Sequence, residues 1–213
     1  MRTHSREGFT LTEIIIALAI MGVVFSAALT AVDSAEGTVQ QTVGRSVLNT
    51  KANRTLARIA NRLTGAGAVA LNSFPSLPDA ADSIEYREVT GFNGTAPLWS
   101  EDRAIRLEYE TGELNNGIDD DGDGLIDECR VVAIRDEGGA NEQRLILATR
   151  VAEFLDGEAP DLIDNNGNGL VDERGLCLTR EGDVLTVRLT VLHPNNGGVI
   201  DARTSLTTIA LRN

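Results

Sequence analysis

An apolar run dominates the start of the chain. Residues 9–32 contain a single formally charged residue, Glu13. Because an α-helix rises about 1.5 Å per residue, about 20 apolar residues are enough to cross the hydrocarbon of a bilayer. The pattern therefore predicts a transmembrane helix over 9–32, and Arg2 and Arg6 before it predict a cytoplasmic N-terminus.

The helical pattern continues over 33–64, where it becomes amphipathic. A stripe of apolar residues recurs at helical spacing, and basic residues such as Arg54 and Arg58 take other faces. The stripe consists of Val39, Val43, Val47, Leu56, Ile59 and Leu63. Such a stripe is typical of a helix that lies against a sheet, and the glycines Gly65 and Gly67 predict its end.

From residue 65 to residue 213 the pattern changes to a period of two. Apolar and polar residues alternate over 105–109 and again over 185–191, which predicts two strands with one buried face each. Weaker strand candidates cover 83–89, 130–135, 144–148 and 205–211. A long helix followed by such strands predicts an α+β fold, with the helix packed on an antiparallel β-sheet domain.

Glu13 is the residue that an ordinary membrane helix does not explain. A charged side chain at mid-membrane costs about 2.5–3.5 kcal/mol on insertion scales, so a partner must offset that cost. Two simpler alternatives stay open. The run is either a secretory signal peptide cleaved near Ala28 or Ala31, or an ordinary single-pass anchor.

The residues before Glu13 resemble a known processing signal. A short basic leader ends in Gly8, Phe9 follows, and Glu13 stands fifth after the break, ahead of the apolar run. This order resembles the class III signal of type IV prepilins and type II secretion pseudopilins. The resemblance implies a leader over 1–8, cleavage after Gly8 by a prepilin peptidase, and N-methylation of Phe9. It also implies that Glu13 is an assembly residue, paired with the N-terminal amine of a neighbouring subunit.

The resemblance further implies a location and partners. Residues 9–32 would form the transmembrane and filament-core helix, single-pass in the inner membrane, and 65–213 would form a periplasmic, pilin-like domain. The partners would be other pilin or pseudopilin subunits, the prepilin peptidase and the inner membrane. Residues 147–154 and 210–213 loosely resemble segments of pseudopilin J and minor pilin W proteins, which favours a J-like or W-like minor subunit over a major pilin.

The β-rich part contains one internal repeat. Residues 118–128 have the sequence IDDDGDGLIDE, and residues 163–173, which follow 45 positions later, have the sequence IDNNGNGLVDE. Each copy places oxygen-bearing side chains at alternate positions of a loop and then a glycine, so that the oxygens can point to one centre. Hard oxygen ligands in flexible geometry select Ca²⁺ over transition metals. The repeat therefore predicts two structural Ca²⁺ sites, in loops 119–128 and 164–173.

The pattern resembles the loops of thrombospondin type 3 repeats and the first half of an EF-hand. It departs from the EF-hand at the twelfth position, where Arg130 and Gly175 replace the closing glutamate. The expected ligands are Asp119, Asp121, Asp123, the Leu125 carbonyl, Asp127 and Glu128 in the first loop, and Asp164, Asn166, Asn168, the Leu170 carbonyl, Asp172 and Glu173 in the second. The second loop has fewer charges, so we expect weaker binding there. Solvated Asn/Asp/Gly turns are the alternative.

The charge and the cysteines limit the remaining possibilities. A net charge of −13 argues against nucleic-acid binding, which needs a basic face. Cys129 and Cys177 are the only cysteines, and each lies just past one of the loops. Outside the cytosol they predict one disulfide that joins the two loops, with two buried free thiols as the alternative.

No catalytic pattern accompanies these features. The sequence has no nucleophile elbow, P-loop or zinc-type Cys/His spacing, and His193 has no evident partner, so we expect no enzyme. The sequence predicts a minor pseudopilin of a type II secretion pseudopilus with structural calcium loops. The alternatives are a minor pilin of a type IV pilus and a membrane-anchored, calcium-dependent surface-binding protein.

Overall fold

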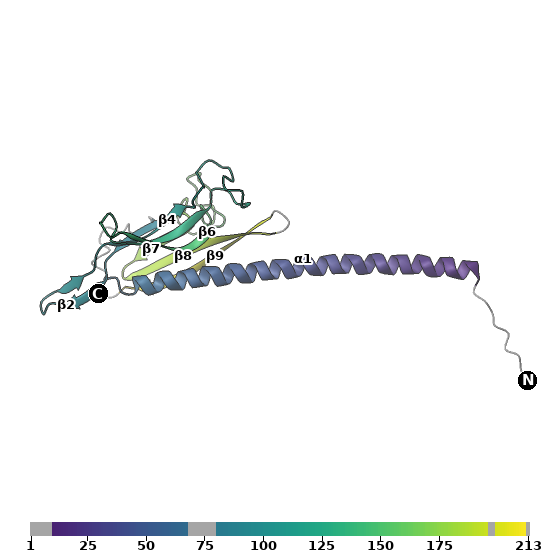
Figure 1. The fold of residues 1–213 in the computed structure, drawn as a ribbon, viewed down its shortest axis with the longest axis horizontal. Helices are drawn as coiled ribbons and strands as arrows, with labels where there is room; N and C mark the ends of the chain where they lie inside the picture. The colour runs from purple at the N-terminus through teal and green to yellow at the C-terminus, as the bar shows by residue number, and fades with distance from the viewer. Residues whose placement is uncertain (1–9, 68–79, 196–198, 212–213) are drawn as a thin grey trace, which may run out of the picture. The chain divides into compact units, whose positions relative to one another are not determined.

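The computed structural model describes residues 10–67, 80–195 and 199–211. Its contacts divide the chain into two units, Met1–Val43 and Gly44–Asn213. The expected processing residues Gly8 and Phe9 lie outside the described residues. The architecture is α+β, as the sequence predicts: one long helix, α1, precedes an antiparallel sheet (Figure 1).

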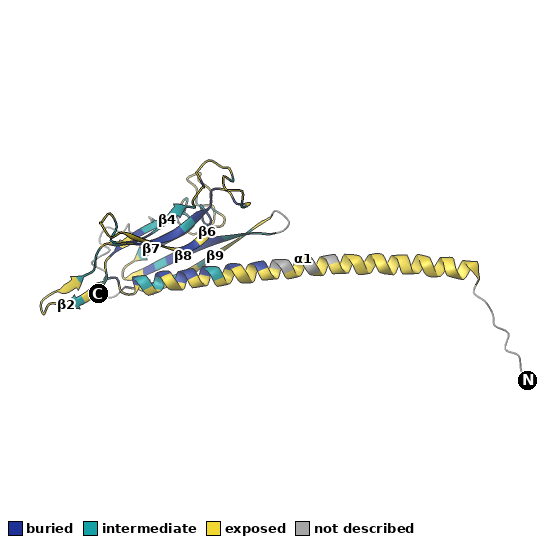
Figure 2. Cartoon of the chain, viewed as in Figure 1, coloured by how far each residue is buried: buried dark blue, intermediate teal, exposed yellow. Residues whose placement is uncertain are grey.

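Helix α1 spans Leu11–Leu63 and contains no proline. In the N-terminal unit its large apolar side chains are exposed, including Leu18 and Phe25, and Figure 2 shows this part of the helix as exposed. Among the described residues, α1 is the one helix long and apolar enough to cross a membrane, judged by length and composition alone. Exposure of such side chains to water is unfavourable, so this surface is suited to lipid or to other apolar helices.

In the second unit α1 packs on the sheet through one face. Leu48, Ala52, Leu56, Ile59 and Leu63 are buried and join the core formed by the strands. Their spacing of three or four residues places them on one side of the helix.

For the N-terminal half of the stripe, the prediction that its residues lie against the sheet was wrong. Val47 is 47% exposed, and Val39 and Val43, in the first unit, are exposed as well. The buried row passes instead through Gly44, Leu48 and Ala52. Because two of these residues are small, the row gives a weak apolar signal although the helix approaches the sheet there.

The main sheet has seven antiparallel strands. They are β1 (Ser83–Tyr86), β4 (Arg103–Tyr109), β5 (Cys129–Arg135), β6 (Gln143–Val151), β7 (Leu176–Glu181), β8 (Val184–Pro194) and β9 (Ile200–Ala210). The order is β1-β4-β5-β6-β8-β7, and β9 pairs with β8. All six predicted strand segments lie in this sheet or, for the end of 83–89, at the start of β2 (Val89–Phe92). The alternation over 185–191 is confirmed, since Leu185, Val187, Leu189 and Val191 are fully buried.

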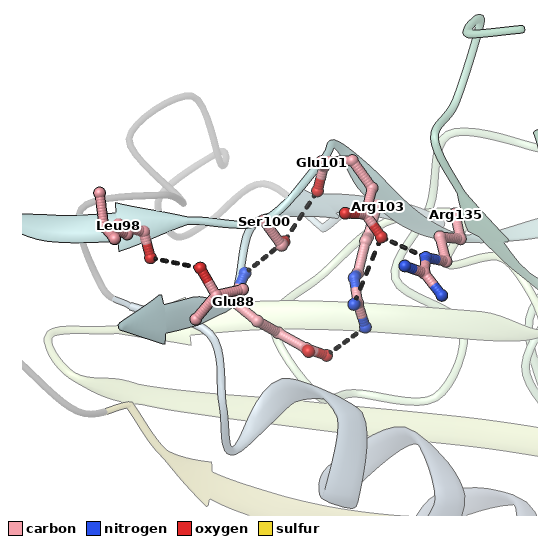
Figure 3. A network of polar contacts seen from close by, with 7 residues as sticks. Glu88, Leu98, Ser100, Glu101, Arg103 and Arg135 are labelled. Carbon is pink, nitrogen blue, oxygen red and sulfur yellow. Dashed lines mark hydrogen bonds and ion pairs between the residues drawn. The ribbon is translucent and has the colours of Figure 1, made fainter. Parts of the chain in front are cut away.

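Strand β2 pairs with β3 (Pro97–Trp99) in a separate two-stranded sheet. A polar network joins this sheet to the start of β4 (Figure 3). The Glu88 amide donates to the Ser100 hydroxyl at 3.0 Å, and the Glu88 carboxylate pairs with Arg103 at 2.7 Å. Glu101 pairs with both Arg103 and Arg135, so the network also reaches the end of β5.

Candidate functional sites in the acidic loops and the N-terminal helix

The two acidic loops leave the sheet and return to it in the same way. The first connects β4 to β5, and the second connects β6 to β7. At the base of the first loop the Glu110 amide donates to the Glu128 carbonyl at 3.0 Å. At the base of the second, the Leu155 amide donates to the Glu173 carbonyl at 2.9 Å. Because these bonds join residues at corresponding positions of the repeat, the loops are duplicates in structure as well as in sequence.

The structural repeat is longer than the sequence motif. Gly112 and Gly157 precede the motif copies at corresponding positions, and their φ angles are 110° and 90°. The glutamates that follow them, Glu113 and Glu158, fold back onto their loops. Glu113 Oε1 accepts from the Asp121 amide at 2.9 Å, and Glu158 Oε1 accepts from the Asn166 amide at 2.9 Å. The repeated unit therefore includes a glutamate that the sequence motif omitted.

The first aspartate of each motif organises the turn. The Asp119 carboxylate accepts from the amides of Gly122 and Gly124 at 2.6 and 3.0 Å. Asp164 accepts from Gly167 and Gly169 at 2.7 and 2.8 Å. All four glycines have φ between 75° and 91°, a region in which a side chain is strained. The glycines are thus required for the turn that surrounds the aspartate.

The other motif side chains lie around the same turn. Oδ1 of Asp121 and of Asp123 accept from the amides two residues further along, both at 3.0 Å. Asp119, Asp121 and Asp123 each offer a carboxylate oxygen within 4.8 Å of the other two. In the second loop Asn166 and Asn168 repeat these turn hydrogen bonds at 3.1 and 2.9 Å. In the first loop, the predicted oxygens at alternate positions therefore do converge.

The two leucines expected to ligate through their carbonyls are anchors of the loops. The side chain of Leu125 is fully buried, and that of Leu170 is 5% exposed. The backbone amide of each leucine donates a hydrogen bond to the side-chain oxygen of the residue two positions earlier. Burial of the side chain fixes the peptide next to the converging oxygens, which suits the expected role of its carbonyl.

Asp127 and Asp172 contact backbone amides at the neck of each loop. Asp127 accepts from the Asn116 and Gly117 amides at distances from 2.8 to 3.2 Å. Asp172 accepts from the Asp161 and Leu162 amides at 3.0 to 3.1 Å. These carboxylates tie the two ends of a loop together, a contribution that the sequence motif did not distinguish from metal ligation.

Glu128 and Glu173 lie beneath the turns and are buried, with 1% and 2% exposure. Both carboxylate oxygens of Glu128, and Oε2 of Glu113, have no hydrogen-bond partner among the described residues. Burial, together with the nearby carboxylates of Glu113 and Asp123, raises the pKa of Glu128 to about 7. A buried carboxylate without a partner is costly, so this arrangement is unfavourable unless a proton or a cation offsets the charge.

The second loop satisfies more of its own oxygens. The Asn168 side-chain amide donates to Glu173 Oε1, whereas the corresponding pair in the first loop, Asp123 and Glu128, are both acids. Oε2 of Glu173 and Oε2 of Glu158 still have no partner among the described residues. Among the described residues, the first loop therefore has more buried carboxylate oxygens without a partner than the second.

A small polar cluster connects the bases of the two loops. The Arg174 guanidinium pairs with Glu153 at 2.7 Å and lies over the rings of Tyr109 and Phe154, 5.5 and 5.2 Å from their centroids. The Tyr109 hydroxyl also donates to Glu153 at 2.6 Å. Tyr109 and Phe154 are corresponding residues of the two repeats, so Arg174 bridges the duplicates.

The predicted disulfide is absent from the structure. Cys129 and Cys177 are both buried free thiols. They belong to different apolar clusters, Cys129 with the residues of α1 and Cys177 with Leu155 and Leu170. In the sheet, β6 and β8 separate their strands. Burial raises the pKa of Cys129 to about 12 and that of Cys177 to about 11, which favours the protonated thiol over the thiolate at neutral pH.

At the N-terminus, Glu13 has a partner within its own helix. Its carboxylate accepts from the amide and the hydroxyl of Thr10, both at 2.8 Å, and the Thr10 hydroxyl accepts from the Glu13 amide at 3.3 Å. This reciprocal pattern is a capping box, in which an N-cap threonine and an acid three residues later satisfy each other's free amides. Glu13 thus caps the first turn of α1, in addition to any contact it makes with another subunit.

The comparison with known proteins bears on this same segment. The family model described as the prokaryotic N-terminal methylation motif matches residues 3–29. This segment therefore carries the N-terminal motif that is typical of prepilin-type proteins. No curated protein and no solved structure matches the chain.

The motif read from the sequence omits Glu113 and Glu158. The signal was present, because both follow a glycine and stand at the same distance before their motif copies. The segments between them and the motifs have diverged from ELNNG to EAPDL, which hides the repeat at the level of residue identity.

Proposed function

We propose that the protein is a minor pseudopilin, J-like, of a type II secretion pseudopilus, and that it assembles through its N-terminal helix. The methylation motif at residues 3–29 carries the proposal. The exposed apolar surface of α1 in the first unit supports it, since neighbouring helices in a filament would bury that surface. The β-rich domain would lie in the periplasm, with the leader and its basic residues on the cytoplasmic side.

The proposal includes one structural Ca²⁺ in each acidic loop. It is supported by the converging oxygens of Asp119, Asp121 and Asp123 and by the same turn hydrogen bonds in the second loop. All of these ligands are oxygens on a flexible loop, which suits Ca²⁺. The role assigned to the metal is to hold the loops in shape, because a loop of mutually repelling acids gains order when a cation binds.

Intact mass spectrometry of the protein from its native membrane tests the filament assignment. We expect loss of residues 1–8 and the addition of one methyl group at Phe9. A chain that keeps its leader, or one cleaved near Ala31, would contradict the assignment and leave an anchored or secreted envelope protein. Gly8→Leu is the matched variant, since a bulky residue at the cleavage position should block processing and leave the apolar helix intact.

A W-like minor pilin of a type IV pilus shares the same N-terminal motif. Deletion strains distinguish the two. Loss of exported enzymes in the culture medium, with surface pili and twitching motility intact, is the expected result. Loss of pili with normal secretion would contradict this and would indicate a minor pilin of a type IV pilus instead.

A further inference from the structure

The cation sites predicted from the motif lack a closing ligand. An EF-hand loop ends in a glutamate that contributes both its oxygens at the twelfth position. Arg130 and Gly175 stand at that position here, and Gly175 has no side chain while Arg130 is basic. In each loop, however, a glutamate that precedes the motif has one carboxylate oxygen buried without a partner among the described residues.

In the first loop this glutamate is Glu113. It lies on the turn that precedes the motif and is 5% exposed. One of its oxygens, Oε1, is fixed by the amides of Asp120 and Asp121 at 3.1 and 2.9 Å. The other, Oε2, is buried without a partner among the described residues.

Glu113 meets two of the expected ligands. Glu113, Asp121 and Glu128 each offer a carboxylate oxygen within 4.8 Å of the other two. Ca²⁺ binds oxygens at about 2.3–2.6 Å, so two ligands of one ion lie at most about 5 Å apart. The three carboxylates are therefore close enough to hold one ion, and Asp121 connects them to the solvent-exposed side of the turn.

The second loop repeats this arrangement. Glu158 lies on the corresponding turn, its Oε1 accepts from the Asn166 amide, and its Oε2 is buried without a partner in the part of the chain that the structure describes. Glu173 corresponds to Glu128 and keeps one free oxygen. Two copies that differ at most intervening positions thus preserve a glutamate with one oxygen tied to the loop and one left free.

From this geometry we propose that Glu113 and Glu158 are the closing ligands of the two cation sites. Each contributes its free oxygen to a divalent cation, Ca²⁺, that also contacts Glu128 or Glu173 and the motif oxygens. This inference rests on the calcium loops proposed above. It assigns to each site two glutamates that have a free oxygen, Glu113 with Glu128 and Glu158 with Glu173.

The test is calorimetric titration of Ca²⁺ into the metal-free, full-length protein in detergent. The variants are Glu113→Gln and Glu158→Gln, with the exposed Glu85→Gln on β1 as the matched control. Glutamine keeps an oxygen to accept the loop amide but replaces the free oxygen with a donor. We expect two sites in the wild type and a loss of affinity of at least tenfold at one site in each variant. The control should bind like the wild type.

Thermal unfolding of the same proteins separates ligation from a structural role. Without Ca²⁺, Glu113→Gln should unfold at the same temperature as the wild type or higher, because it removes a buried carboxylate that lacks a partner. With Ca²⁺, its increase in midpoint should be smaller than that of the wild type. A residue that only supports the loop would lower the midpoint in both conditions.

The outcomes distinguish this inference from the function it rests on. If the wild type binds Ca²⁺ at two sites and both variants bind within twofold of it, the closing-ligand assignment is overturned and the calcium loops stand. If the wild type binds no Ca²⁺, the calcium loops themselves are overturned, and this assignment with them.

Discussion

At the scale of single residues, Glu13 combines two contributions that the structure and the motif suggest separately. Its hydrogen bond from the Thr10 amide caps the start of α1, and caps of this kind contribute about 1 kcal/mol to the stability of a helix. Its charge, in an apolar helix, suits a pairing with a neighbouring subunit's N-terminus. The capping box could have been predicted from Thr10 and Glu13, because their spacing is that of a threonine followed three residues later by an acid.

Two substitutions separate these contributions. Glu13→Gln keeps an oxygen that can accept the Thr10 amide but has no charge, whereas Glu13→Ala removes both. If charge pairing drives assembly, both variants should be absent from the filament fraction while their membrane levels match the wild type. Immunoblots of sheared filaments and of membranes measure this. Normal incorporation of Glu13→Gln would show that the cap is sufficient and would contradict the pairing.

The two thiols give a second prediction at this scale. Because burial raises the pKa of Cys129 and Cys177 to about 12 and 11, a thiol reagent should label neither in the folded protein at pH 7.5. In guanidinium chloride without reductant, both should react at once. Extraction of the protein in the presence of an alkylating agent excludes a disulfide that forms by oxidation after extraction. Fewer than two thiols per unfolded chain would support the disulfide and contradict the structure.

At the scale of elements, the sequence signal was strong where one face of a strand or helix is buried and weak elsewhere. The alternation over 185–191 located β8, because its buried residues are large and evenly spaced. Strand β7 was missed since its first four residues are all buried, which removes the alternation. Strands β2 and β3 were missed because they are short and largely exposed. On α1, small residues in the buried row shifted the predicted face by one position.

The corrected face of α1 leads to a stability prediction. Leu56 is 3% exposed and Val47 is 47% exposed. Leu56→Ala should lower the free energy of unfolding by about 2–5 kcal/mol, the range for a large core side chain. Val47→Ala should change it by no more than about 0.5 kcal/mol. Guanidinium unfolding of the full-length protein in detergent, followed by circular dichroism, compares them. Equal losses would mean that the sheet contacts the predicted stripe rather than the observed row.

At the scale of the whole molecule, the acidic loops account for the uneven distribution of charge. Much of the excess acid in a chain of net charge −13 lies in two loops joined at their bases by Arg174. The loops leave the same sheet that packs on α1, so their order bears on the stability of that unit. The sequence predicted the loops from their repeat but not the cluster between them, since Tyr109, Glu153 and Arg174 are distant along the chain.

Removal of Ca²⁺ should therefore destabilise the domain. A ligand present at 100 times its dissociation constant stabilises the folded state by about 2.7 kcal/mol per site. For a chain of 150–250 residues, each kcal/mol shifts the midpoint by about 2–4 °C. Chelation should thus lower the thermal midpoint by about 5–10 °C per site, as measured by circular dichroism before and after addition of a chelator.

Salt provides the control, because screening by ions also reduces the repulsion between the carboxylates of the loop. Added NaCl screens exposed charges beyond about 8–10 Å, but it does not supply a divalent cation that the buried Glu128 could bind. Ca²⁺ should therefore restore the midpoint of the chelated protein, and 0.15 M NaCl at the same pH should not. Asp121→Asn provides the matched variant in the first loop, because asparagine keeps an acceptor for the Asp123 amide, loses one charge and stands at the corresponding position of the second loop as Asn166. It should remove part of the Ca²⁺ effect. Full restoration by NaCl alone would mean that the loops only repel and that the metal has no structural role.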